Sequence, residues 1–185
     1  MIVCWWVFAF TFWLRKRPPR AREAKRDWSS LLGLLLQAAA YGLVWFDPLR
    51  RRPLSFASSS SPVIDDILSL AAVLIAVLSV WLVNSAARQL GKQWALAARL
   101  VDQHELVQNG PYSFVRNPIY TGMLGMLIAT GLVLQQWIAL AIAIVVFLAG
   151  TYIRIRCEER LLREAFGTKF DEYASRVPAL VPGIY

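Results

Sequence analysis

The chain has 185 residues, of which 57% are hydrophobic and eight are tryptophan. Its mean hydropathy of +0.47 is too high for an ordinary soluble domain, and the tryptophans suit anchoring at a membrane surface. The net charge of +8 comes mostly from loops beside apolar runs, which indicates orientation in an anionic membrane and not nucleic-acid binding. Cys4 and Cys157 form no CxxC pattern, which argues against a disulfide scaffold or a zinc site.

Five apolar runs predict an all-α bundle with about five membrane-spanning helices, at residues 1–14, 28–46, 63–83, 119–134 and 138–155. The first run has 14 residues, whereas a span needs roughly 20, and its cations follow it, unlike those of a signal peptide. It is either a short span aided by snorkelling of residues 15–17 or a run cut short at Met1, and we treat it as a span.

The last two runs are separated only by Gln135, Gln136 and Trp137, which predicts a tight helical hairpin. Small residues in the fourth run predict close helix packing there: Gly122, Gly125, Ala129 and Gly131. Residues 84–107 alternate basic and apolar side chains, which indicates an amphipathic helix near the membrane surface. The charged tail opens with a helical run at 157–166, which Gly167 is expected to end.

The distribution of cations predicts how the chain is oriented. With five spans, 17 of the 20 Lys and Arg residues fall in segments 15–27, 84–118 and 154–185, which share one side. The positive-inside rule places that side in the cytoplasm and the N-terminus outside. Segments 108–122 and 154–185 are therefore expected to meet at the cytoplasmic side of the membrane, which we expect to be a bacterial cytoplasmic membrane.

The stretch 108–122 is polar and rich in turns. It begins with Gly110-Pro111, a turn signal, and ends with Asn117-Pro118, where proline opens the next helix. Its tyrosines and Asn117 offer hydrogen bonds and aromatic faces to a small polar ligand. The alternative is a set of interfacial anchors with Arg116 snorkelling to lipid phosphate. The two prolines and the amide favour the ligand site.

Two further groups have both a functional and a structural interpretation. His104, the only histidine, either contacts a ligand as a hydrogen-bonding or acid-base group or is a polar residue at a helix end, and position alone favours the second. Arg154 and Glu158 lie four residues apart and share a helix face. They form either a solvated ion pair or, if they face inward, a site for a cationic or hydroxyl-rich ligand beside an anionic acceptor.

Taken together, residues 90–182 resemble the isoprenylcysteine carboxyl methyltransferase family, whose broader relatives include phospholipid N-methyltransferases. The matching motifs are His104-x-Leu106-Val107, Gly110-Pro111-Tyr112-x-x-x-Arg116-Asn117-Pro118-x-Tyr120-x-Gly122, Glu158-Glu159-x-Leu161-Leu162, Phe166-Gly167 and Tyr173-x-x-Arg176-Val177-Pro178. Leu90-Gly91-Lys92-x-Trp94 fits the segment that precedes them. The motifs are specific as an ordered set, and the first three spans resemble no family.

The resemblance implies a membrane-embedded methyltransferase that uses S-adenosylmethionine and acts on a lipophilic acceptor. It implies cofactor-binding roles for His104, Leu106, Val107, Tyr112, Asn117, Pro118, Ile119, Tyr120 and Glu158, and a substrate-facing role for Arg154. It divides the chain into N-terminal spans at 1–89 and a catalytic region at 90–185. The family usually has histidine where this chain has Asn117, and an amide cannot take up a proton near neutral pH.

The expected reaction needs no metal and no covalent nucleophile. Methyl transfer from a sulfonium to a carboxylate requires chiefly alignment of the two reactants and neutralisation of the acceptor's charge. The resemblance implies carboxyl O-methylation, and this chemistry is consistent with it. The alternatives are N-methylation of a lipid amine, for which His104 is the only base titrating near neutral pH, and a membrane carrier or assembly protein without activity.

Overall fold

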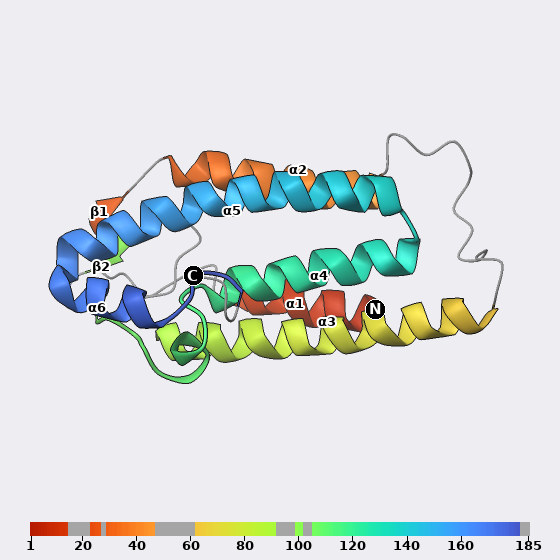
Figure 1. The fold of residues 1–185 in the computed structure, drawn as a ribbon, viewed down its shortest axis with the longest axis horizontal. Coiled ribbons are helices and arrows are strands. Elements are labelled where there is room, and N and C mark those ends of the chain that lie inside the picture. Colours follow the sequence, from red (N-terminus) through yellow and green to blue (C-terminus); the bar gives the residue numbers. More distant parts are fainter. Residues whose placement is uncertain (15–22, 27–28, 47–61, 92–98, 102–104, 182–185) are drawn as a thin grey trace.

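The computed structural model describes residues 1–14, 23–26, 29–46, 62–91, 99–101 and 105–181. Within these residues, the long helices run along the long axis of the molecule (Figure 1) and are α1 (Ile2–Leu14), α2 (Ser30–Phe46), α3 (Pro62–Leu90), α4 (Pro118–Leu134) and α5 (Trp137–Phe166). Shorter elements gather at one end and are β1 (Glu23–Arg26), β2 (Arg99–Val101), the 3-10 turn η2 (Gly110–Ser113) and α6 (Thr168–Arg176). The long helices begin and end close to the predicted apolar runs, except that α3 and α5 extend further.

Helix α4 lies in the middle of the bundle (Figure 1), with α2 and α5 side by side along one flank and α1 and α3 along the other. Successive long helices run in alternating directions. The ends of α1, α3 and α5 and the beginnings of α2 and α4 therefore share one end of the bundle, with β1, β2 and α6. We call this the polar end.

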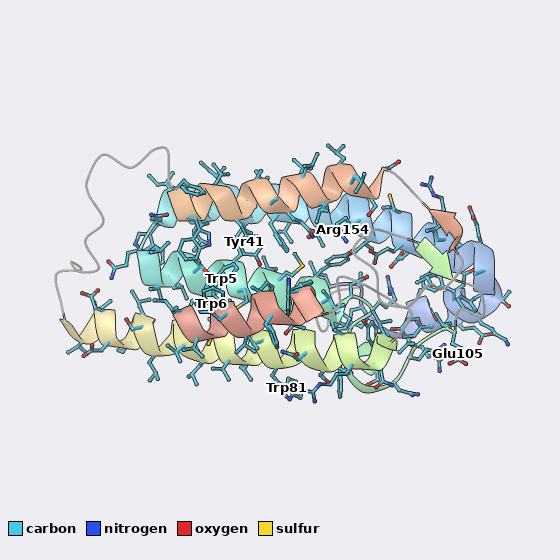
Figure 2. The ribbon with its side chains drawn as sticks, turned by 180° about the vertical axis from the view of Figure 1, so that it is seen from behind. Trp5, Trp6, Tyr41, Trp81, Glu105 and Arg154 are labelled. Atoms are coloured by element: carbon cyan, nitrogen blue, oxygen red, sulfur yellow. The ribbon has the colours of Figure 1, made fainter. Side chains whose placement is uncertain are left out.

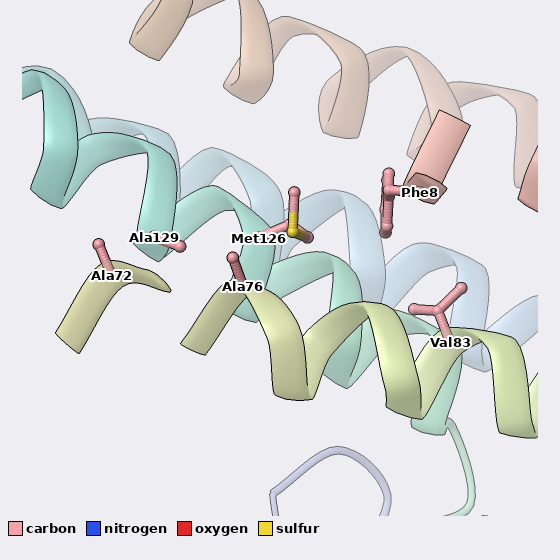
Figure 3. Close-up of a cluster of buried hydrophobic side chains, with 6 residues drawn as sticks. All are labelled: Phe8, Ala72, Ala76, Val83, Met126 and Ala129. Carbon is pink, nitrogen blue, oxygen red and sulfur yellow. The ribbon is translucent and has the colours of Figure 1, made fainter. Parts of the chain in front are cut away.

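Two buried clusters hold the long helices together on opposite sides of α4. One joins α1, α3 and α4 (Figure 3) through Phe8, Ala72, Ala76, Val83, Met126 and Ala129. The other joins α2, α4 and α5 through Ala40, Val44, Leu127, Leu140, Ala143 and Phe147. Because neighbouring residues of a helix point in different directions, Met126 belongs to the first cluster and Leu127 to the second.

The small residues of α4 do allow close packing, as predicted. A Cβ on Gly122 would lie 2.5 Å from Val83 Cγ2, and one on Gly125 would lie 2.1 Å from Ser79 Oγ, so α3 approaches where these side chains are absent. Gly131 likewise makes room for Leu140 of α5. Beyond it the chain reverses within two residues, and Gln135 has a left-handed conformation with φ of 51° that caps α4.

The outer surface of the bundle is apolar. Helix α3 from Val63 and helix α5 are each long and apolar enough to cross a membrane, and α1, α2 and α4 are shorter apolar helices. Leucine and tryptophan side chains on α3 are exposed, among them Leu74 and Trp81. Trp81 points outward from the bundle in Figure 2. Outward apolar side chains along a bundle of this length fit a lipid environment better than water.

The amphipathic helix predicted for residues 84–107 is wrong at residues 99–101 and 105–107, and residues 92–98 and 102–104 lie outside the described residues. Helix α3 continues without a break to Leu90 and is followed by Gly91 with φ of 52°, a conformation that ends helices. Residues Arg99–Val101 form β2, which pairs antiparallel with β1, and residues 105–108 are not helical. The backbone partner of β2 comes from a segment more than 70 residues earlier, which periodicity within 84–107 cannot reveal.

Helix α5 extends past the predicted span to Phe166, and Gly167 ends it as expected. Gly167 has φ of 53°, and its N–H donates to the Arg163 carbonyl. Arg154 and Glu158 therefore lie on the same uninterrupted helix as the membrane-crossing part, near its polar end. Helix α6 then turns back (Figure 1), and the carbonyls of residues 178–180 accept hydrogen bonds from the beginning of α4 and the two residues before it.

Candidate active site

Three polar side chains meet at the polar end, between α4 and α5. Arg154 Nε donates a hydrogen bond of 2.8 Å to the Tyr120 hydroxyl, which in turn donates to Glu158 Oε1. Arg154 Nη2 lies 3.9 Å from the same carboxylate oxygen. Tyr120 thus connects a cation to a carboxylate one helical turn away, and we call these residues the Arg-Tyr-Glu cluster.

Burial differs within the cluster. The Arg154 side chain is 5% exposed and the Glu158 side chain is 29% exposed. A guanidinium stays charged at any ordinary pH, so its burial is costly unless partners compensate it. Tyr120 compensates the burial of Arg154 through two contacts. Its hydroxyl accepts the hydrogen bond from Arg154 Nε, and its ring centre lies 5.1 Å from Arg154 Cζ. Oε2 of Glu158 has no partner among the described residues, so the carboxylate is the open member of the cluster.

Helix α2 determines how Arg154 lies. A Cβ on Gly33 would stand 2.5 Å from Arg154 Cγ and 2.5 Å from the Gly150 carbonyl oxygen. The absent side chain leaves room for the Arg154 stem. A helix that the motifs do not include therefore orients the cation toward Tyr120.

The central turn places a buried tyrosine beside this cluster. Tyr112 lies in η2, and its carbonyl accepts a hydrogen bond of 2.7 Å from the Tyr173 hydroxyl of α6. Burial raises the pKa of the Tyr112 phenol well above its usual value, and the nearby Glu158 carboxylate raises it further. Burial also raises the pKa of Tyr173 to about 12. Both phenols are therefore neutral at physiological pH, and Tyr112 lies within electrostatic reach of Glu158.

Arg116 connects the central turn to α5 and to the chain after α6. Its Nε and Nη2 approach Glu159 Oε1 at 3.0 and 2.9 Å. Its Nη1 donates to the Ala174 carbonyl at 2.7 Å and also to the Val177 carbonyl. These contacts satisfy the guanidinium within the protein, so the alternative of snorkelling to lipid phosphate does not describe this side chain.

The segment after α6 is held against the beginning of α4 by a series of hydrogen bonds. The backbone N–H groups of Arg116 and Asn117 donate to the carbonyls of Pro178 and Ala179. Asn117 Nδ2 donates to Ala179 O at 2.8 Å, and Thr121 Oγ1 donates to Leu180 O at 2.6 Å. The amide of Asn117 thus has a structural role, which sequence motifs did not reveal.

The predicted site residues therefore fall into groups. The structure brings Tyr120, Arg154 and Glu158 together, with Tyr112 nearby. Pro118 is buried at the first position of α4, Ile119 and Val107 are half-buried, and Leu106 packs on the cluster of Phe170, Tyr173 and Val177. His104 lies outside the described residues, so its predicted role is not tested by the geometry.

Sequence reasoning missed a polar pair inside the membrane-like region. Gln37 of α2 donates to Thr151 Oγ1 of α5 at 2.8 Å, and both side chains are buried. Gln37 Oε1 has no partner in the described structure. The sequence does contain a signal for this pair, because Gln37 lies halfway along an apolar run. A polar side chain exposed to lipid is costly, so such a residue indicates a contact inside the bundle.

A cavity of about 660 Å³ opens beside α5, and none of the predicted site residues lines it. Its lining consists of Ser29, Tyr152, Ile153, Arg156, Cys157, Glu159, Arg160, Arg163 and Glu164. At 100° per residue, Arg156 points about 200° away from Arg154, to the opposite side of the helix. In the described ranges, no group of three His, Cys, Asp or Glu side chains is placed to hold a metal ion.

Comparison with known proteins identifies the family. The phospholipid methyltransferase family matches residues 67–169, which is more than half of the chain, so the protein belongs to this family. The matched segment contains η2, α4, α5 and most of α3, and with them the Arg-Tyr-Glu cluster.

Curated relatives agree with the resemblance described above. Protein-S-isoprenylcysteine O-methyltransferase B of Arabidopsis thaliana is 41% identical over 87 residues, covering 45% of this chain and 43% of the relative. The Protein-S-isoprenylcysteine O-methyltransferase of Saccharomyces cerevisiae is 38% identical over 81 residues, covering 44% and 34%. A nickel-cobalt-cadmium resistance protein of Alcaligenes xylosoxydans is 32% identical over 108 residues, covering 58% and 50%. The chain spans half or less of the length of these relatives.

A solved structure has the same fold. The eukaryotic intramembrane Ras methyltransferase ICMT (isoprenylcysteine carboxyl methyltransferase) aligns with a TM-score of 0.57 and 20% identity, over 83% of this chain and 52% of that one. With the outward-facing apolar helices, this likeness establishes a helical membrane-protein fold.

Proposed function

We propose that the protein is an S-adenosylmethionine-dependent methyltransferase that forms methyl esters on a lipophilic, prenylated carboxylate. The observation that carries the proposal is the Arg-Tyr-Glu cluster, which lies within the family segment at the polar end of the bundle. The cluster offers one buried cation and one accessible carboxylate, which are the two charges that an anionic acceptor and a cationic donor require.

The residues present fit this cofactor. The accessible Glu158 oxygen lies near the aromatic residues Tyr112 and Tyr120, and a carboxylate with aromatic rings attracts a sulfonium cation and accepts hydrogen bonds from ribose hydroxyls. The bound cofactor would supply an activated methyl group. Asn117 would use its Oδ1, since its Nδ2 is committed to Ala179. We assign the rest of the pocket to His104, Leu106, Val107, Pro118 and Ile119, within a catalytic region at 90–185.

Arg154 would serve the acceptor. A carboxylate acceptor is already ionised near neutral pH, so the protein must neutralise its charge and align it rather than remove a proton. The hydrogen bond from Arg154 Nε to Tyr120 fixes the guanidinium plane before an acceptor arrives. The apolar outer surfaces of the helices suit an acceptor whose tail stays in lipid while its carboxylate reaches the polar end.

We further propose about five membrane spans with the polar end in the cytoplasm, where the soluble cofactor is available. The description of the family as phospholipid methyltransferases favours a second candidate, N-methylation of a lipid amine. That reaction requires a base for the amine proton, and His104 is the candidate for it.

A labelled-methyl assay on the purified full chain distinguishes these functions. We expect transfer from labelled S-adenosylmethionine to a farnesylated cysteine with a free carboxylate, and release of the label as methanol in alkali. An alkali-stable label on phosphatidylethanolamine would support N-methylation instead. Absence of S-adenosylhomocysteine binding by calorimetry would refute both enzymatic proposals.

Variants of the cluster test the two assigned roles. We expect Glu158→Ala to weaken S-adenosylhomocysteine binding at least about tenfold, because a hydrogen bond to a charged group is lost. Arg154→Ala should reduce methyl transfer by a larger factor than it reduces cofactor affinity. Glu172→Ala, at an exposed position on α6, is the matched control and should change neither. Equal cofactor affinity for wild type and Glu158→Ala would remove the assignment of Glu158.

A further inference from the structure

The cavity beside α5 is a second polar site, separate from the Arg-Tyr-Glu cluster. It lies at the polar end, where the outer side of α5 passes the beginning of α2 at Ser29. Its volume of about 660 Å³ is within the range of ligand sites. Three arginines line it, one turn or less apart along the helix: Arg156, Arg160 and Arg163.

Three arginines line the cavity against two glutamates, Glu159 and Glu164. Glu159 is engaged by Arg116, which lies outside the cavity lining. Arg163 pairs with Asp171 at 2.7 Å, but both side chains are about half exposed, so the pair is weak. Arg156 contacts no carboxylate in the described residues. By formal charge the lining therefore has one more positive than negative group.

Tyr152 orients the cation best placed for a ligand. Arg156 Nε donates to the Tyr152 hydroxyl at 3.0 Å, and Arg156 Cζ lies 5.1 Å from the ring centre. This arrangement occupies Nε and leaves the two terminal nitrogens as a fork, the geometry that binds two oxygens of a phosphate. Arg160, one turn further along α5, lines the same cavity.

An apolar track leads along α5 to this fork. Val145 is 68% exposed and Tyr152 is 59% exposed, and both lie on the outward side with Ala149. Eleven residues separate Val145 from Arg156, a rise of about 16 Å. That length is close to the thickness of one leaflet's hydrocarbon, about 15 Å. The track and the fork together match the acyl chain and the phosphate of a single phospholipid.

We propose that this cavity binds an anionic phospholipid, with its phosphate on Arg156 and one acyl chain along Val145 and Tyr152. The site is on the opposite side of α5 from the Arg-Tyr-Glu cluster, so it is not the acceptor site of the proposed reaction. A lipid there would hold the polar end of α5 and the beginning of α2 at the membrane surface.

Native mass spectrometry of the full chain in neutral detergent tests the proposal. With phosphatidylglycerol added, we expect a retained lipid adduct and a higher Tm, and with phosphatidylcholine a weaker effect on both. Arg156→Gln should raise the phosphatidylglycerol concentration for half-saturation at least about tenfold, as expected for loss of charged hydrogen bonds. Arg88→Gln, an exposed arginine at the polar end of α3, is the control and should behave like wild type.

Competition experiments distinguish lipid binding from simple anion binding. Soluble glycerol phosphate and inorganic phosphate should not displace the lipid at equal concentration, because they lack the acyl chain. Displacement by either, equal effects of the two lipids, or equal effects of Arg156→Gln and Arg88→Gln would overturn the proposal. Arg156→Lys keeps the positive charge, so it can be used if Arg156→Gln folds poorly. We expect it to bind phosphatidylglycerol with an affinity between those of wild type and Arg156→Gln.

Discussion

At the scale of single residues, Tyr120 is the group on which the cluster depends. Its hydroxyl accepts from Arg154 and donates to Glu158, so it uses both of its hydrogen-bonding capacities at once. Arg154 and Glu158 approach each other directly only at 3.9 Å. Without the hydroxyl, the cation and the carboxylate would each lose a short contact.

We expect Tyr120→Phe to reduce kcat for methyl transfer by roughly 10- to 100-fold, because hydrogen bonds to charged groups are worth about 1.5–3 kcal/mol. The ring remains, so the cation–π contact with Arg154 and most of the stability should remain. The measurement is steady-state transfer together with the Tm of the purified variant. Tyr152→Phe, on the opposite side of α5, is the control. Full activity of Tyr120→Phe would mean that the hydroxyl does not position Arg154.

Arg116 is a second residue with a defined role, because it joins three parts of the chain through one guanidinium. Arg116→Lys keeps the charge but loses the planar fork, so the segment 174–180 should loosen. We expect faster hydrogen exchange at residues 177–180, while the amides of α4 beyond its first turns stay protected. Arg176→Lys, whose Nε bonds only the nearby Glu172 carbonyl, should show wild-type exchange. Unchanged exchange in Arg116→Lys would contradict the role.

At the scale of elements, the closest packing between α2 and α5 occurs where two glycines meet. A Cβ on Gly150 would lie 2.7 Å from the Gly33 carbonyl oxygen, and one on Gly33 would lie 2.5 Å from the Gly150 carbonyl. This close approach allows Gln37 to reach Thr151 and lets Arg154 pass beneath Gly33. The α2–α5 pair therefore supports the site although α2 contributes no residue to the family motifs.

Two substitutions in the same helix test this role of α2. Gly33→Ala must displace either Arg154 or the α5 backbone, and we expect a loss of about 1–3 kcal/mol in stability with reduced methyl transfer. Gly42→Ala meets no atom within 4 Å and should leave activity unchanged, with a slight gain in helix stability. Thermal unfolding and activity of both variants, in the same detergent, give the comparison. Equal behaviour of the two would show that the close approach does not matter.

At the scale of the whole molecule, alternating helix directions bring the polar segments to one end. The β1–β2 pair joins a segment before α2 to one after α3, and the chain after α6 joins the beginning of α4. These contacts agree with the grouping of 17 Lys and Arg residues on one side in the sequence. The candidate site and the cavity beside α5 both lie at this end.

Cysteine labelling tests the orientation of the molecule. In a chain with Cys4 and Cys157 replaced by alanine, Ser113→Cys in η2 and Asp66→Cys near the beginning of α3 lie at opposite ends. A membrane-impermeant maleimide should label Ser113→Cys only from the cytoplasmic side and Asp66→Cys only from the other side. Labelling of both from one side would contradict the proposed spans, and the reverse pattern would contradict the proposed orientation.

The sequence by itself determined where the long helices lie, which segments share an end, and which family motifs the chain contains. Apolar length, helix-ending glycines and charge are local properties, so they can be recognised without knowing what packs against what. The same local reasoning failed at β2, because a strand's hydrogen bonds go to a distant segment.

Which side of α5 faces inward, and what each polar group contacts, depends on how the helices pack against one another. The spacing of Arg154 and Glu158 shows a shared helix face, but only the packed helices show that this face turns toward Tyr120. In the same way, Asn117 and Arg116 meet partners on a segment about 60 residues later in the chain. Such contacts depend on the relative placement of whole helices, which no residue pattern within one helix contains.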